Sequence, residues 1–232
     1  MSDTKAPVAI WPEGVPRPLM PYTPAVKAAG WLFLSGRLAS DFENGLAPSV
    51  RPANANLGDK LALESRYILQ DLARTAKAAG FDLDRDAVRI WQWFTSQYPT
   101  NEEFREGNTW PRINISPYLQ TRNEFISDPR PASTAMAVKE LLVRDTTLEV
   151  DVICVEGEAQ SVGYPVPGGL PAPLGGYSPA IRRGDWIFLS GEIPIDWVGD
   201  WMGSQHMGAY SALAKDARVN PYLWYGSEIE KQ

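Results

Sequence analysis

The stretch YTPAVKAAGWLFLSGRL occupies residues 22–38, and a close copy of it, YSPAIRRGDWIFLSGEI, occupies residues 177–193. The two copies align without a gap, and Tyr, Pro, Ala, Trp, Phe, Leu, Ser and Gly recur at matching positions. A repeat of this length predicts that one supersecondary unit is built twice. The first copy is followed by enough chain to complete a domain, whereas the second lies close to the last residue, Gln232. We therefore expect one complete unit and one partial unit.

The composition is that of an ordinary globular chain, with 44% hydrophobic and 22% charged residues. A net charge of −6 disfavours a nucleic-acid surface, which requires a basic patch. The sequence has no apolar run of about 18 residues, so no membrane span is expected. The first residues lack a basic region followed by an apolar stretch, so we expect no secretory signal and a cytoplasmic location.

The sequence contains one cysteine, Cys154, and one histidine, His206. A single cysteine cannot form an internal disulfide, which is typical of a reducing compartment. Zinc sites in proteins draw several ligands from Cys and His, so no site of that kind is expected. A Ser-His-Asp triad would have to use His206, which lies in a Gly/Ser/Met-rich stretch and is therefore a poor candidate.

Apolar periodicity along the first unit alternates between strand and helix patterns. In the strand expected at 87–96 both faces are apolar, because Trp91 and Trp93 lie opposite Val88 and Ile90, which is typical of a strand covered on both sides. The expected elements, in chain order, are an extended arm at 1–21, a strand at 31–35, a turn at Asn44-Gly45, a helix at 61–79, the strand at 87–96, an interrupted helical region at 102–126, and strands at 133–138 and 147–155. This order predicts an α+β fold in which two helices cover one face of a mixed sheet.

A Gly/Pro-rich stretch divides the chain. Residues 157–175 contain several glycines and prolines, which is typical of a semi-stiff linker. We therefore expect a complete unit with its N-terminal arm over 1–156, a linker over 157–175, and a partial second repeat over 176–232.

Five short sequence motifs are similar to those of a known family: PYTPAV at 21–26, FLSG at 33–36, AAG at 78–80, PAST at 131–134 and LEVDVI at 148–153. Together they resemble the RidA/YjgF family of small imine/enamine deaminases. The resemblance covers residues 18–156, and the second copy matches only the family's first two strands. It implies a chorismate-mutase-like α+β unit that forms trimers with pockets between neighbouring subunits. It also implies activity on small 2-imino or 2-enamino acids without a cofactor.

The resemblance also implies site residues. The family's pocket tyrosine matches Tyr22, its Ser-Gly matches Ser35 and Gly36, and the acidic residue of its last strand matches Asp151, with Glu149 on the same face. Asp151 would position or activate the attacking water. Tyr22, Ser35 and the backbone N–H groups near Gly36 would bind the developing charge. Catalytic roles are therefore expected for Tyr22, Ser35 and Asp151, and substrate contacts for Gly36 and Glu149.

The segment 131–134 departs from the family. The family text PARS contains an arginine that holds the substrate carboxylate, whereas this chain reads PAST, ending in the substrate-binding candidate Thr134. A guanidinium binds a carboxylate through two parallel charge-assisted hydrogen bonds that Ala or Ser cannot reproduce. Arg130 lies nearby, directly before this segment, but is displaced from the position of the lost arginine. Arg37, which the second copy replaces with Glu192, is our second candidate for the missing positive charge.

The leading hypothesis is a hydrolytic deaminase of a small imine, enamine or aminomuconate-type acid. Its expected partners are a small carboxylate-bearing metabolite and further copies of the chain, in a trimer or a trimer-based homo-oligomer. The alternative is a non-catalytic ligand-binding or regulatory protein that kept the pocket after losing the arginine. In a third interpretation, the second copy only completes an oligomer interface, because its WIFLS strand would otherwise expose an apolar edge.

Overall fold

The computed structural model describes residues 6–51, 58–106, 113–157, 162–164 and 176–192. His206 and the remainder of the predicted second repeat, 193–232, lie outside these residues. The first unit is a six-stranded sheet in the order β1-β2-β3-β6-β4-β5, in which only the β4–β5 pair is parallel. Its strands are β1 (Val8–Ile10), β2 (Ala25–Ala28), β3 (Trp31–Leu38), β4 (Ala87–Thr95), β5 (Ala132–Val138) and β6 (Leu148–Val155). The expected mixed sheet is confirmed.

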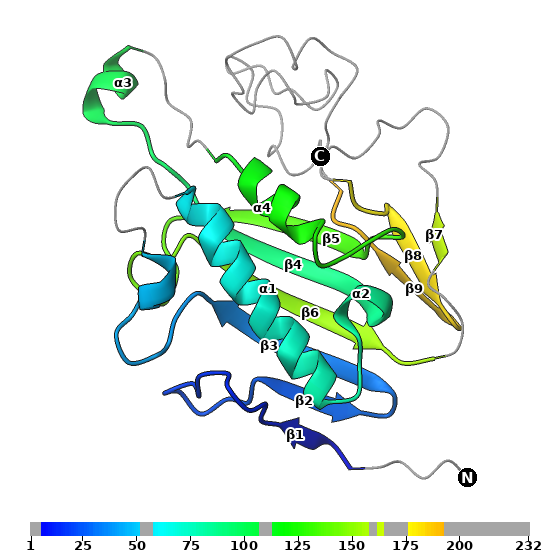
Figure 1. The fold of residues 1–232 in the computed structure, drawn as a ribbon. Helices are drawn as coiled ribbons and strands as arrows, with labels where there is room; N and C mark the ends of the chain where they lie inside the picture. The colour runs from blue at the N-terminus through cyan, green and yellow to red at the C-terminus, as the bar shows by residue number, and fades with distance from the viewer. Residues whose placement is uncertain (1–5, 52–57, 107–112, 158–161, 165–175, 193–232) are drawn as a thin grey trace, which may run out of the picture.

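Two helices cover one face of this sheet (Figure 1). The long helix α1 (Lys60–Ala78) begins at Asp59, whose side chain accepts a hydrogen bond from the backbone N–H of Ala62 at 3.1 Å. Such a cap satisfies one of the helix's otherwise unpaired amides. Helix α4 (Ser116–Arg122) packs beside α1. The α+β layer arrangement expected from the sequence is therefore present.

The core lies between α1 and the sheet. Ile68 and Leu72 of α1 are buried in one cluster with Leu32, Ile90 and Val152 of the strands. Side chains alternate along a strand, so the neighbours of these residues point to the other side. We call that other side the open face. The half-buried side chains on the open face include those of Arg89, Trp91, Trp93, Thr134, Glu149 and Asp151.

The shorter elements refine the expected ones. The turn at Asn44-Gly45 forms with Gly45 at φ +81°, but it closes only an isolated bridge between Ser40 and Leu46. The hairpin next to it is β2–β3. The region 102–126 contains α4 and a helix α3 (Asn101–Arg105). The remaining short elements are β1 within the expected arm, η1 (Pro48–Val50) and α2 (Leu83–Asp86).

The repeated sequence builds the same hairpin twice. A second sheet contains β7 (Val162–Tyr164), β8 (Ala180–Arg183) and β9 (Trp186–Leu189), in that order. The pairing of Arg183 with Trp186 in β8–β9 reproduces that of Ala28 with Trp31 in β2–β3. Strand β7 pairs with β8 as β1 pairs with β2. The second sheet therefore draws on residues before 176, because β7 lies inside the segment expected to be a linker.

The second sheet is attached to the first unit by a buried contact. Ile181 packs against Val88, Ala132 and Val155 in a small apolar cluster. Arg183 is 2% exposed and pairs at 2.8 Å with Asp86 at the end of α2. Figure 1 accordingly shows β8 and β9 beside β4 and β5.

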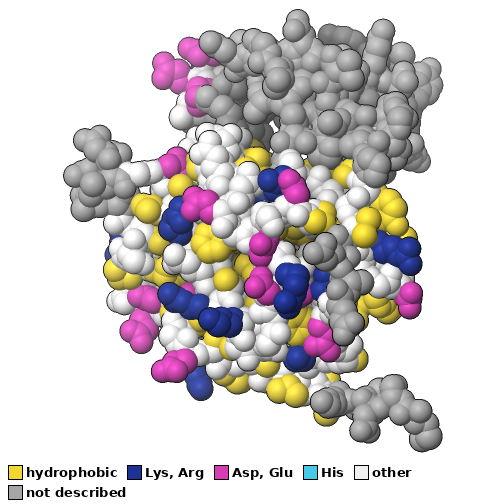
Figure 2. All heavy atoms as spheres, turned by 45° about the vertical axis from the view of Figure 1, so that its right-hand side comes forward, with side chains coloured by type: hydrophobic (Ala, Val, Ile, Leu, Met, Phe, Trp, Pro, Cys, Tyr) yellow, Lys and Arg dark blue, Asp and Glu magenta, His cyan; other side chains and the backbone are white. Residues whose placement is uncertain are grey.

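The surface seen in Figure 2 carries charges of both signs. Lys and Arg side chains lie there among Asp, Glu and hydrophobic side chains. In the described part of the chain, no helix is both long and apolar enough to cross a membrane. Within the same residues, no group of three or more His, Cys, Asp or Glu side chains is arranged to hold a metal ion.

Candidate functional site

Four of the expected site residues meet at the end of β3. Tyr22, Ser35, Gly36 and Arg37 line one hollow together with Asp71 of α1. Its volume is about 10 Å³, which is near the minimum for one water molecule. Burial raises the pKa of Tyr22, while the nearby charges of Arg37 and Glu149 act in opposite directions. The structure brings these residues together, but the hollow has no room for a metabolite.

Arg37 has a charged partner inside the protein. Its Nε and Nη2 atoms donate to Oδ2 of Asp71 at 3.0 and 2.6 Å, and the side chain is almost fully buried. Nη2 also donates to the carbonyl oxygen of Ser40 at 3.1 Å. We expected Arg37 to supply the positive charge for a substrate carboxylate. The structure instead turns its guanidinium toward α1, so carboxylate binding by Arg37 stays a prediction that this geometry disfavours.

Ser35 makes the same local contact in both repeats. Its Oγ donates to the carbonyl of Thr23 at 2.7 Å, and in the second copy Ser190 Oγ donates to the carbonyl of Ser178 at 2.6 Å. In each copy, this hydrogen bond connects the serine that follows the hairpin's last paired residue to the residues that precede its first strand. The hydroxyl proton of Ser35 is therefore already engaged in a hydrogen bond within the first copy. The catalytic role expected for Ser35 stays a prediction.

Gly36 leaves space for the carboxylate of Glu149. A Cβ at Gly36 would lie 2.1 Å from Oε1 of Glu149, far closer than atoms can approach. The absence of a side chain at Gly36 therefore allows an acidic side chain of β6 to lie against β3. Burial raises the pKa of Glu149, and the neighbouring Asp151 raises it further.

Asp151 lies at the centre of the open face. Its Oδ2 accepts a hydrogen bond from the indole Nε1–H of Trp93 at 3.2 Å. Burial raises the pKa of Asp151, while the Trp93 hydrogen bond and the positive charge of Arg89 lower it. A half-buried carboxylate with a raised pKa and a fixed orientation is suited to general acid–base chemistry.

Arg89 is a member of this site that the sequence analysis missed. Its guanidinium lies 4.2 Å from the ring centre of Trp91, and Nη2 donates to Thr134 Oγ1 at 3.3 Å. Nη1 donates to the carbonyl of Leu189 in the second hairpin. The signal was available in the alternation of β4, because a charged residue shares a face with Trp91 and Trp93 in an otherwise apolar strand.

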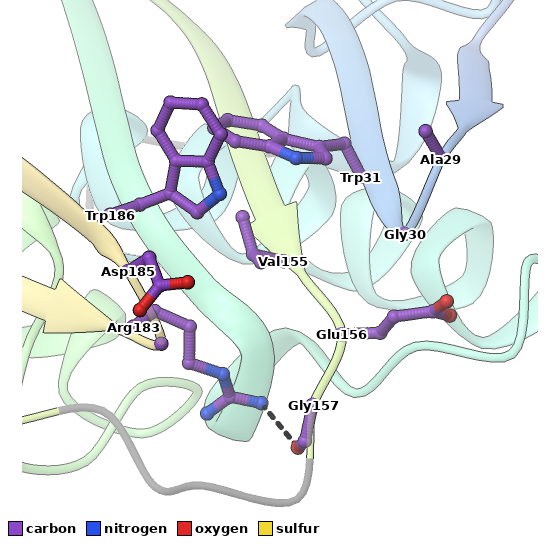
Figure 3. A pocket seen from close by; sticks show the side chains of 10 residues that line it. Ala29, Gly30, Trp31, Val155, Glu156, Gly157, Arg183, Asp185 and Trp186 are labelled. Atoms are coloured by element: carbon purple, nitrogen blue, oxygen red, sulfur yellow. Dashed lines mark hydrogen bonds between the residues drawn. The ribbon is translucent and has the colours of Figure 1, made fainter. Parts of the chain in front are cut away.

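A separate cavity of about 300 Å³ lies where the two hairpin turns meet (Figure 3). Equivalent tryptophans of the two copies, Trp31 and Trp186, contact each other edge to face beside it, with ring centres 5.1 Å apart. Arg183, at its base, donates to the carbonyl of Gly157 at 3.1 Å. None of the expected site residues lines this cavity. We therefore place the candidate site on the open face, at Asp151 and Arg89, although this cavity is the larger hollow.

The chain was compared with protein families, with known proteins and with solved structures. No protein-family model matches the chain. The 3-aminoacrylate deaminase RutC of Acinetobacter baylyi is 30% identical over 142 residues, which are 61% of this chain and 91% of that protein. A RutC family protein of Pyrococcus horikoshii is 23% identical over 144 residues, which are 62% of this chain and 94% of the relative. The solved structure of RidA from the Antarctic bacterium Psychrobacter sp. is 19% identical, with a TM-score of 0.45, and the match covers 64% of this chain and 99% of that one.

The chain belongs to the RutC/RidA family.

The relatives match only part of this chain. Each of the two sequence matches spans nearly the whole relative but less than two thirds of this chain. The RidA/YjgF resemblance inferred from the sequence is therefore confirmed. The boundaries 1–156, 157–175 and 176–232 stay predictions.

Residues 131–134, where the resemblance implied an arginine that this chain lacks, form hydrogen bonds with the end of the second hairpin. The backbone N–H of Ser133 donates to Ser190 Oγ at 2.8 Å. The N–H of Gly191 donates to the carbonyl of Ser133 at 3.0 Å and to Thr134 Oγ1 at 3.1 Å. Arg130 is bound nearby, to Asp128 at 3.0 Å and to the carbonyl of Gly176 at 3.1 Å. The structure thus brings Thr134 to the open face but directs Arg130 toward the start of the second copy.

We expect Gly191→Ala to loosen the second hairpin. The added Cβ would lie 2.8 Å from Thr134 Oγ1 and 3.0 Å from its Cγ2, and Thr134 is a short, stiff side chain that cannot easily move away. Overpacking of this kind costs about 1–3 kcal/mol. Amide hydrogen exchange across β8 and β9 should therefore become faster. The double variant G191A/T134A returns the space and should recover most of the protection; equal protection in wild type and G191A would contradict the contact.

Proposed function

We propose that the chain is a hydrolytic deaminase that releases ammonia from a small imine or enamine acid, including acids of the aminomuconate type. The observation that carries this proposal is Asp151, a half-buried carboxylate that Trp93 orients and whose pKa burial raises. The resemblance in sequence, which matches Asp151 to the family's acidic residue, supports this choice. The deaminase name of the Acinetobacter relative supports the same reaction class.

The proposed reaction is the addition of water to a C=N bond. Asp151 accepts a proton from water as the water oxygen bonds to the imine carbon and the C=N π electrons move to nitrogen. The nitrogen takes back the proton held by Asp151 to give the neutral carbinolamine. The hydroxyl proton then passes to the nitrogen as the C–N bond breaks, so that ammonia leaves and the carbon keeps a carbonyl oxygen. An enamine substrate first takes a proton on carbon and gives up one from nitrogen to become the imine. The indole N–H of Trp93 holds the carboxylate in place throughout.

Ammonia release tests this function directly. Purified protein would be added to freshly generated 2-aminoacrylate, to 2-aminomuconate and to 3-aminoacrylate, and the rate compared with the uncatalysed reaction. Acceleration of at least one reaction is expected. The absence of acceleration for all three, together with tight binding of a carboxylate metabolite, would favour the alternative of a non-catalytic binding protein.

The hydrogen bond from Trp93 predicts a pH effect. Asp151 must be ionised to act as a base, so kcat/KM should fall as the pH drops through its pKa, which lies above the ordinary 3.8. The Trp93 bond stabilises the ionised form, so Trp93→Phe should move this acid limb to higher pH. The pH profile of ammonia release measures the shift. Trp11→Phe in the N-terminal arm is the matched control and should leave the limb in place; a limb that moves to lower pH in W93F would contradict the assignment.

The assembly and the cell compartment stay predictions. We propose a trimer or a trimer-based homo-oligomer in the cytoplasm, acting on a carboxylate-bearing metabolite. Aromatic side chains such as Phe33, which is 44% exposed on the face that carries Asp151, are consistent with burial in an assembly.

A further inference from the structure

Arg89 lies beside the segment that lacks the family arginine. In the parallel β4–β5 pair, Arg89 is in register with Ala132, and Trp91 is in register with Thr134. The Arg89 side chain therefore extends from the strand next to 131–134, on the open face. The lost arginine corresponds to Ser133, which is in register with Ile90 and whose Oγ donates to Gln92 Oε1 at 3.1 Å on the helix-covered face. Arg89 instead places a guanidinium on the face that carries Asp151.

The partners of Arg89 are neutral. Its two hydrogen bonds go to a hydroxyl, on Thr134, and to a backbone carbonyl, on Leu189. Within the described part of the chain it forms no ion pair, and its buried Nε has no hydrogen-bond acceptor. A guanidinium has five N–H donors, so each Nη atom keeps a second N–H that can donate to an anion.

The other candidate arginines differ in this respect. Arg37 is held by the carboxylate of Asp71, and Arg130 by that of Asp128. Binding a substrate through either residue would require breaking an existing ion pair. Arg89 requires no such exchange, and stacking on Trp91 already fixes the plane of its guanidinium.

We propose that Arg89 binds the carboxylate of the substrate in place of the arginine missing from 131–134. This inference rests on the proposed function, because it assigns the substrate's acid group to the same site as Asp151.

Arg89 and Asp151 share one face of the sheet but belong to different strands. Trp91 pairs with Asp151 across the sheet, and Arg89 lies two positions earlier on β4. The Arg89 guanidinium contacts Thr134 of β5, whereas Asp151 belongs to β6, on the other side of β4. The simplest substrates for a test are small 2-imino acids, in which the reacting carbon carries the carboxylate directly.

Calorimetric binding of pyruvate tests the assignment. Pyruvate is the 2-oxo acid product of the smallest such substrate, and pyruvamide has the same shape without the negative charge. We expect wild type to bind pyruvate but not pyruvamide, and Arg89→Gln to weaken pyruvate binding by roughly 30-fold or more, as expected when one partner of a desolvated charge pair is removed. Arg66→Gln is the matched control. Arg66 lies on α1, on the other side of the sheet, in an exposed pair with Glu124, and its loss should leave binding unchanged.

A second variant covers the case in which Arg89→Gln does not fold. Arg89→Lys keeps the charge but loses the planar fork, so it should bind pyruvate more weakly than wild type. Unchanged pyruvate affinity in R89Q, or in R89K where R89Q is unfolded, would overturn the assignment, as would equal affinity for pyruvamide. The proposed function fails separately: binding that depends on Arg89 without ammonia release from any imine would leave Arg89 as a carboxylate ligand and exclude the deaminase.

Discussion

Asp151→Asn is expected to lower the rate of ammonia release by about 10²–10⁴-fold, the usual contribution of a general acid–base group. An amide cannot take a proton from water at neutral pH, but it keeps the shape of the carboxyl. Its oxygen can still accept the hydrogen bond from Trp93, which is 3.2 Å long in the native protein. Because burial of the charged carboxylate is unfavourable, the variant should be at least as stable as wild type.

This combination separates catalysis from folding. Steady-state ammonia release gives the rate, and thermal unfolding gives the stability. Asp145→Asn is the matched control, since Asp145 has a positive φ of 67°, which asparagine also tolerates, and it lies outside the site. If folded D151N keeps a rate within about threefold of wild type, Asp151 is not the base, because general bases contribute far more than this.

Arg37→Met is expected to destabilise the protein by about 3–5 kcal/mol, the usual cost of removing one partner from a buried ion pair. The loss leaves Asp71 buried, with only the more distant Arg74, at 3.4 Å, as a charged partner. Burial already raises the pKa of Asp71, and Arg37 opposes that rise. Without Arg37 the carboxyl should bind a proton more readily.

Arg74→Met is the matched control for this effect. Arg74 pairs with the same carboxylate, but its side chain is 57% exposed, so its loss should cost only about 0–1 kcal/mol. Urea unfolding of both variants measures the difference. Similar stability of R37M and R74M would show that the buried pair contributes little. Loss of carboxylate binding in R37M without loss of stability would instead restore the role that the sequence analysis proposed for Arg37.

Much of the fold could be predicted from local pattern. The repeat predicted one supersecondary unit built twice, and the structure identifies this unit as a hairpin, because β8–β9 reproduces the register of β2–β3. The expected helix 61–79 and strand 87–96 correspond to α1 and β4 within one residue at each end. These predictions succeeded because helix periodicity and strand alternation are properties of neighbouring residues.

The site could be predicted only in part. Asp151 and Glu149 were recognised through the resemblance to the family, whose last strand carries an acidic residue at the matching position. The partners of arginines could not be recognised, because an ion pair such as that of Arg37 with Asp71 joins residues far apart in the sequence. The second repeat was expected to be partial, and nothing in the sequence indicated that Leu189 would contact Arg89.

The sequence by itself determined the family, the duplicated hairpin and the side of the sheet on which Asp151 lies, since each follows from identity or alternation along the chain. Only the tertiary structure decided which cation faces Asp151. Arg37, Arg89 and Arg130 carry the same charge, and their roles differ because Arg37 and Arg130 form ion pairs with carboxylates, whereas the hydrogen bonds of Arg89 go to neutral acceptors. Electrostatic role depends on distance and burial in three dimensions, and a linear sequence contains neither.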